Sequence, residues 1–123
     1  TLIEQGIVPV MAPLTHDGQG SLLNTNADTI ASETAKALAP YFDVTLMYSF
    51  EHAGVLTDAD DESSVIPLIT AESFETLKAD GTVNGGMIPK IENALAAVNA
   101  GVKKVIITKA DAIHDDTLGT TIK

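Results

Sequence analysis

Apolar residues gather in three short runs that predict buried β-strands. The runs span residues 6–13, 43–49 and 102–108, and valine, isoleucine, leucine and methionine dominate them. Each is bounded by glycine, proline or polar residues, as is typical of parallel strands at the centre of an α/β sheet. Residues 15–20 and 57–64 are polar or acidic and predict loops.

Two shorter runs predict strands at the edges of the same sheet. Residues 65–69 contain Pro67, which cannot donate to the ladder of a central strand and is tolerated at an edge. The run Gly119 to Ile122 near the end of the chain predicts a last edge strand.

Three other stretches predict helices. Apolar side chains recur at helical spacing in residues 26–39 and 88–98, and the residues Thr70 to Ser73 open the helix predicted at 70–79. Pro40 closes the first helix, and Gly101 ends the third.

Strands that alternate with helices predict one α/β domain over residues 1–123, without internal repeat or linker. We expect a three-layer α/β/α sandwich around a mainly parallel sheet. Such sheets bind ligands at the carboxyl ends of their strands. The polar residues that precede the helices at 26–39 and 88–98 would lie at that edge.

The negative charge of the chain argues against polyanionic binding partners. Seventeen acidic residues oppose seven basic ones, which gives a net charge of -10, so nucleic acid and anionic membranes are poor partners.

No apolar run reaches the length of a membrane span, and residues 1–6 do not resemble a signal peptide. The chain has no cysteine, so we expect a cytoplasmic setting. All seven basic residues are lysines, so a carboxylate clamp made by arginine is absent.

Lys90 occupies an unusual place for a lysine. It lies in the first turns of the third helix, shortly after Gly85 and Gly86. A helix N-terminus repels a cation and attracts an anion, often a phosphate that accepts from free backbone N–H groups. Glycines there let the backbone approach such a phosphate closely. The ordinary alternative is an exposed lysine whose stem lies along apolar surface.

Asn24, Asn26 and Asp28 form a second polar group, before the first helix. Asn26 as N-cap and Asp28 as an acidic first-turn residue would explain two of them structurally. Asn24 is left unexplained, and its amide could donate to a substrate carboxylate while Asp28 orients lysines.

No metal site is expected. His16, His52 and His114 lack the spacing of metal ligands, and residues 58–62 lack the glycine and closing glutamate of a calcium loop. The usual nucleotide and hydrolase motifs with glycine-rich turns are absent as well.

Four segments in this order resemble the C-terminal half of the acetylglutamate kinases, in the amino-acid-kinase family. They are Asn24 to Asp28, Gly54 to Leu56, Asp80 to Lys90 and Gly119 to Ile122. The resemblance covers essentially the whole chain. It implies the C-terminal, nucleotide-binding domain of the amino-acid-kinase fold.

The resemblance implies transfer of the γ-phosphoryl group of ATP, with Mg²⁺, to the side-chain carboxylate of an N-acylglutamate in arginine biosynthesis. Lys90 would stabilise charge on the transferring phosphoryl group and Asp28 would position the lysines. Asn24, with Asn26, would bind the acylglutamate substrate. ATP would contact Glu51, His52, Ala53, Gly54, Val55, Leu56, Thr82, Val83, Asn84, Gly86 and Met87, with adenine near Met87.

The resemblance also implies that an N-terminal domain for substrate binding and dimerisation is absent. That domain would carry a second catalytic lysine, the arginine clamp and the contact of a homo-oligomer. The 123 residues alone are then expected to be inactive. Phe50 and Glu51 replace the Ser-Asp or Thr-Asp pair usual in the family, which alters the expected nucleotide contacts.

Two alternatives stay open from the sequence. The chain could be an isolated nucleotide-binding or folding module without a catalytic role. It could also belong to a relative with another acceptor, such as aspartate, carbamate or UMP.

Overall fold

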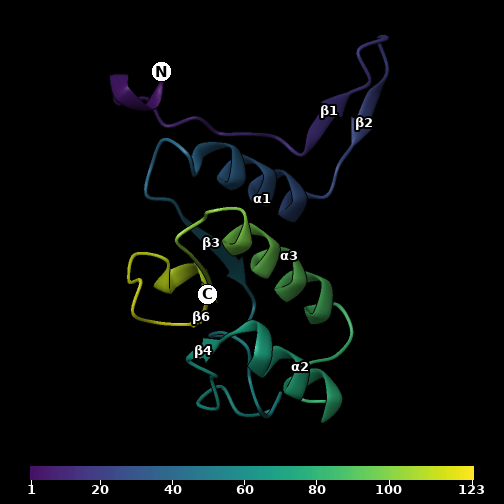
Figure 1. Ribbon diagram of the computed structural model, residues 1–123, viewed down its shortest axis with the longest axis vertical. Coiled ribbons are helices and arrows are strands. Elements are labelled where there is room, and N and C mark those ends of the chain that lie inside the picture. Colours follow the sequence, from purple (N-terminus) through teal and green to yellow (C-terminus); the bar gives the residue numbers. More distant parts are fainter.

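The computed structural model describes all 123 residues as an α/β domain with three α-helices (Figure 1). The elements in chain order are η1 (Ile3–Gln5), β1 (Leu14–His16), β2 (Leu22–Asn24), α1 (Ala27–Leu38), β3 (Thr45–Phe50), β4 (Leu68–Ile69), α2 (Ala71–Ala79), α3 (Met87–Asn99), β5 (Lys104–Lys109), η2 (Ala110–Ala112) and β6 (Thr120–Ile122).

The main sheet has four strands in the order β3-β5-β6-β4. β3 pairs with β5 in parallel and β4 pairs with β6 in parallel, whereas β5 and β6 are antiparallel. The predicted α/β class and mainly parallel sheet are therefore confirmed. β4 lies at an edge, as Pro67 indicates.

All three predicted helices form, and local hydrogen bonds explain where they begin. The side chain of Asn26 accepts from the N–H groups of Asp28 and Thr29 and caps α1. At α2 the side chains of Thr70 and Ser73 cap each other's backbone N–H. α3 ends before Gly101, which has a φ of 107°.

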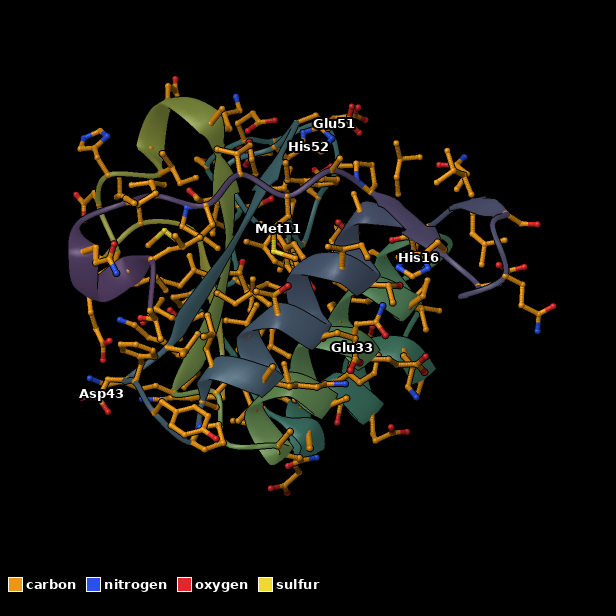
Figure 2. The ribbon with its side chains drawn as sticks, turned by 90° about the horizontal axis from the view of Figure 1, so that it is seen from above. Met11, His16, Glu33, Asp43, Glu51 and His52 are labelled. Atoms are coloured by element: carbon orange, nitrogen blue, oxygen red, sulfur yellow. The ribbon has the colours of Figure 1, made fainter.

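The α-helices lie together on one side of the sheet, and the short turn η1 lies on the other side (Figure 2). α1 and α3 pack against each other and against the strands. Ile91 of α3 and Val105, Ile107 and Ile122 of the sheet are fully buried and form the centre of the core. In this chain the second outer layer consists of extended chain and 3-10 turns rather than α-helices.

The prediction of a buried strand over residues 6–13 is wrong. This segment forms no strand, and Val8 and Val10 are 83% and 95% exposed. The apolar side chains of this segment would suit burial. Its backbone, however, pairs with no strand of the sheet. The loop prediction at 15–20 is wrong for residues 15 and 16, which pair in β1, whereas residues 17–20 lie in the turn of the short hairpin β1–β2. This hairpin projects from the domain (Figure 1).

The prediction that the run Gly119 to Ile122 forms an edge strand is also wrong. β6 lies between β5 and β4, and Thr120 and Ile122 are completely buried. Thr120 Oγ1 accepts from the backbone N–H of Val55, 2.8 Å away. The C-terminal strand therefore joins the middle of the sheet to the loop that follows β3.

No helix of the domain is both long and apolar enough to cross a bilayer.

Gly119→Ala should lower the free energy of unfolding of the domain far more than Gly81→Ala. Both glycines have a φ near 80°, but a Cβ at Gly119 would lie 2.4 Å from the carbonyl oxygen of Ile107, whereas at Gly81 it would meet nothing. We expect a loss of about 1 kcal/mol in unfolding free energy for Gly81→Ala and about 3 kcal/mol or more for Gly119→Ala, measured by urea denaturation. Equal losses would contradict this packing.

Candidate functional site

The beginnings of α1 and α3 meet beside the carboxyl end of β3. Lys90 Nζ in α3 lies 2.5 Å from Asp28 Oδ2 in α1, although 62 positions separate the two residues. Because α1 and α3 pack side by side and precede the parallel strands β3 and β5, both N-termini lie at the same sheet edge. The two residues predicted to be catalytic are thus brought into contact.

The ion pair is partly shielded from water. The side chain of Lys90 is 16% exposed and that of Asp28 is 36% exposed. A lysine is unfavourable at a helix N-terminus, and the Asp28 carboxylate offsets both its charge and its partial burial.

Two aromatic rings of β3 lie next to the ammonium of Lys90. Its Nζ is 4.7 Å from the ring centre of Tyr48 and 5.9 Å from that of Phe50. The Tyr48 hydroxyl donates to the backbone carbonyl of Asp28 at 3.3 Å. Burial, and then the negative charge of Asp28, raise the pKa of Tyr48, so the hydroxyl remains a donor.

A cavity of about 350 Å³ opens beside this cluster, and Phe50 forms part of its wall. Eight of the eleven residues predicted to contact ATP line it together with Thr57, Ala59 and Gly81. These eight are Glu51, His52, Gly54, Val55, Leu56, Thr82, Asn84 and Met87. The segments after β3 and before α3, distant in sequence, therefore face one space.

The other three predicted contacts lie elsewhere. Val83 is 2% exposed and belongs to the hydrophobic core. Ala53 lines a different cavity, on the side of Pro67 and Thr108. Gly86 is the N-cap of α3, outside the cavity wall.

The backbone of the two glycines before α3 offers hydrogen-bond donors. The N–H groups of Met87 and Ile88 donate to the carbonyls of Asn84 and Gly85, while those of Gly85 and Gly86 donate to no protein acceptor. A Cβ at either glycine would meet nothing within 4 Å, so the approach to both is open. The N–H groups of the two glycines are therefore free donors directly before α3.

The two asparagines have different surroundings. The Oδ1 of Asn26 is committed to capping α1. Asn24 ends the exposed strand β2, and no hydrogen bond joins its side chain to Asp28 or Lys90. Of the polar residues predicted to lie together before α1, only Asp28 pairs with Lys90. The side chains of Asn24 and Asn26 take no part in this contact.

Glu62 connects the acidic loop to the loop that lines the cavity. Its carboxylate lies 2.5 Å from Nδ1 of His52, accepts from the N–H of Ala53 at 3.1 Å and is 3.4 Å from Lys109 Nζ. The hydrogen bond with His52 is the main reason that the pKa of Glu62 falls to about 2. Figure 2 shows Glu51 and His52 next to each other at this end of the domain.

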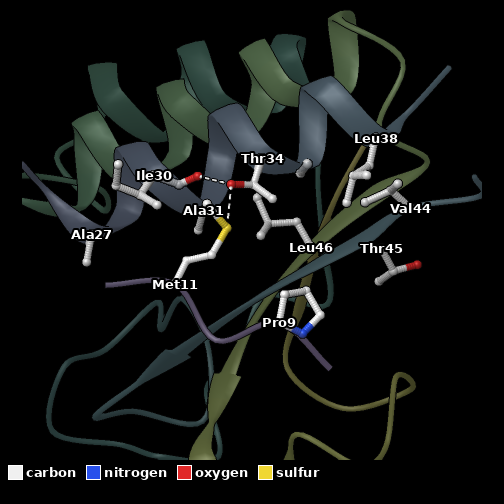
Figure 3. Close-up of a pocket in the computed structure, with 11 residues that line it drawn as sticks. Pro9, Met11, Ala27, Ile30, Ala31, Thr34, Leu38, Val44, Thr45 and Leu46 are labelled. Carbon is white, nitrogen blue, oxygen red and sulfur yellow. Dashed lines mark hydrogen bonds between the residues drawn. The ribbon is translucent and has the colours of Figure 1, made fainter. Parts of the chain in front are cut away.

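A second cavity, of about 340 Å³, has a different character. It lies between the N-terminal segment, α1 and β3, and Figure 3 shows Pro9, Met11, Ile30, Leu38 and Leu46 around it. No charged side chain lines it. It does not suit a phosphate or a carboxylate.

No group of three or more His, Asp or Glu side chains is arranged to hold a metal ion. The aspartates of the acidic loop bond their own backbone: Asp58 accepts from Asp60, and Asp61 accepts from Ser63.

Tyr48 and Glu62 belong to this region although neither is predicted there from the sequence, and Phe50 is expected there only as a replacement in the Ser-Asp or Thr-Asp pair of the family. The alternation of Tyr48 and Phe50 along one strand places both rings on one face, and this pattern could have revealed them. Glu62 contacts His52 because the loop between them folds back. No periodic pattern in the sequence predicts such a loop conformation.

Replacing Glu62 should lower stability at neutral pH and have little effect in strong acid. A lowered carboxyl pKa contributes stability above its unfolded value of 4.5, and that contribution is lost as the pH falls from about 4.5 toward 2. The unfolding free energies of wild type and Glu62→Gln should therefore differ at pH 7 and converge near pH 2. Urea titrations would measure this, with the exposed Glu92→Gln as control; a difference independent of pH would contradict the ion network.

The amino acid kinase family model matches residues 1–109. The acetylglutamate kinases of Phocaeicola vulgatus and Bacteroides thetaiotaomicron are each 65% identical to the chain over 122 residues, 99% of its length. The chain spans about half the length, 47%, of these relatives.

Solved structures resemble the domain over nearly its whole length. The protein smu.665 of Streptococcus mutans is 33% identical with a TM-score of 0.78, and the match covers 99% of this chain and 45% of that one. A carbamate kinase of Giardia, at 22% identity, has a TM-score of 0.72 over 98% of this chain and 44% of that one, which shows a shared fold. With the family model matched over most of its residues, the chain belongs to the amino acid kinase family.

Proposed function

We propose that this chain is the nucleotide-binding half of an enzyme that transfers the γ-phosphoryl group of ATP to the side-chain carboxylate of N-acetylglutamate or another N-acylglutamate. The main support is the Lys90–Asp28 pair at two helix N-termini, next to the cavity whose wall includes Phe50. The names of the relatives at 65% identity support the acceptor.

In this proposal ATP occupies the cavity between the loop 51–57 and the segment 81–87. Val55, Leu56 and Met87 supply apolar wall for the adenine. The phosphates extend past Phe50 toward Lys90 and toward the free N–H groups of the glycines before α3. Backbone donors at the start of a helix suit phosphate oxygens.

Lys90 then stabilises negative charge on the transferring phosphoryl group, and Asp28 holds the ammonium in place. Phosphoryl transfer needs positioning and electrostatic stabilisation more than covalent help from the protein. Mg²⁺ bound to the ATP phosphates would neutralise part of their charge, which matters in a chain of net charge -10.

The acylglutamate would lie on the other side of the ion pair, near Asn24 and Asn26. The side-chain N–H₂ of Asn26 remains available, because only its Oδ1 is used in the cap. The chain contains no arginine for a carboxylate clamp. We therefore propose that the clamp lies in the part of the relatives that this chain does not span, where the family resemblance also implies a second catalytic lysine and the contact of a homo-oligomer.

Lys90→Met should weaken binding of MgATP about ten- to a hundredfold without changing the binding of adenosine. A charge-assisted hydrogen bond to phosphate contributes about 1.5 to 3 kcal/mol, and adenosine lacks the phosphates. Calorimetric titration would measure both ligands, with Lys123→Met as a control of equal charge change. Unchanged MgATP binding by Lys90→Met, or no binding by the wild type, would refute the proposed site.

The chain alone should bind MgADP and show no turnover with ATP and N-acetylglutamate. Mixing it with the N-terminal half of the Phocaeicola vulgatus relative should restore activity in a coupled kinase assay. Turnover by the 123 residues alone would contradict the proposal of a half-site. A mixture that binds nucleotide but stays inactive with N-acetylglutamate and turns over with aspartate, carbamate or UMP would assign another acceptor.

A further inference from the structure

The aromatic rings beside Lys90 form a surface for its ammonium. Tyr48 and Phe50 are two positions apart in β3, so both rings project from the face of the sheet that α1 and α3 cover. With Nζ at 4.7 Å and 5.9 Å from the two ring centres, both contacts are within the range of cation–π attraction. Lys90 is therefore held from two sides, by a carboxylate and by aromatic faces.

Tyr48 also ties this arrangement to the start of α1. The residue is 5% exposed, and its hydroxyl donates to the carbonyl of Asp28, the residue whose carboxylate pairs with Lys90. One side chain thus contacts both members of the ion pair.

We propose that Tyr48 and Phe50 are positioning residues for Lys90, whose rings hold its ammonium beside Asp28 while leaving N–H donors free for a phosphate oxygen. The phosphate in this statement rests on the proposed function. The stacking of Lys90 on the rings does not, and it can be tested without a nucleotide.

The reason lies in the donors of the ammonium. Lysine has three N–H donors, and Asp28 is the only hydrogen-bond acceptor of Nζ in the structure. A second carboxylate or a backbone carbonyl would stabilise the charge but would occupy another donor. An aromatic face attracts the cation through its quadrupole and supplies no oxygen acceptor. The lysine is thereby fixed and still able to bind an anion.

The simpler interpretation is that Tyr48 and Phe50 only fill the core. In that case a leucine, which also suits a buried β-strand position, would serve as well. Ligand binding would then be unaffected by the loss of the ring, or would be weakened equally for ligands with and without phosphates.

The test compares Tyr48→Phe, which keeps the ring, with Tyr48→Leu, which removes it. Phe50→Leu is a second variant at a less buried position, in case Tyr48→Leu does not fold, and Tyr41→Leu is a control at an 80% exposed tyrosine. Proton NMR of the Lys90 side chain reports the ring-current shift. Calorimetry gives the affinities for MgATP, inorganic tripolyphosphate and adenosine.

We expect the Lys90 Hε protons to resonate upfield of those of the other lysines in wild type, Tyr48→Phe and Tyr41→Leu. In Tyr48→Leu this shift should largely disappear, and in Phe50→Leu it should decrease. Affinity for MgATP and tripolyphosphate should fall about fivefold in Tyr48→Leu, the factor that corresponds to about 1 kcal/mol, while adenosine binding stays unchanged.

Lys90 shifts that are the same in Tyr48→Leu, Phe50→Leu and wild type would overturn the proposal. So would an equal loss of affinity for MgATP and adenosine. If the wild type binds no nucleotide, the proposed function fails, while the ring-current comparison still decides whether the rings position Lys90.

Discussion

A lysine in the first turns of a helix needs a nearby anion, and in this domain that anion is Asp28 in the first turn of another helix. The field of the helix opposes Lys90 by several tenths of a kcal/mol, and a partly exposed ion pair returns about 1 kcal/mol at most. The pair therefore contributes little net stability. Its consequence is geometric, because it holds the N-termini of α1 and α3 at one place on the sheet edge. Their positive ends then create a local attraction for anions in a protein of net charge -10.

Contacts from the rest of the domain hold the loop after β3 in place at this end of the sheet. β6 lies inside the sheet, and Thr120 Oγ1 accepts from the N–H of Val55 in the loop that lines the cavity beside Phe50. A Cβ on Gly54 would come within 2.7 Å of the same oxygen, so the loop reaches the sheet only because this residue is a glycine. On the outer side, Glu62 holds the same loop through His52 and Ala53. A surface loop that would otherwise be mobile is thus fixed at both sides.

Much of this could be predicted from the sequence, because local patterns determine helices and their caps. Asn26, Thr70 and Gly101 mark helix ends by chemistry that acts within a few residues. The contact of Asp28 with Lys90 also follows from topology, since both helices precede strands of one parallel pair. The central position of β6 did not follow, because strand order depends on which strands lie side by side after folding. The segment 6–13 has the pattern of a buried strand, and pattern alone does not tell whether the sheet provides a neighbour for it.

The position of the nucleotide phosphates is the central claim, and Mn²⁺-ATP would test it most directly. Bound Mn²⁺ broadens the NMR signals of nearby residues, so an amide spectrum of the chain maps the metal–phosphate group. Broadening should be strongest at Gly85, Gly86 and Lys90, extend to Asp28, and weaken along α1 toward Leu38 at its far end. Broadening centred on the acidic loop at residues 58–62, with Gly85 and Lys90 unaffected, would contradict it.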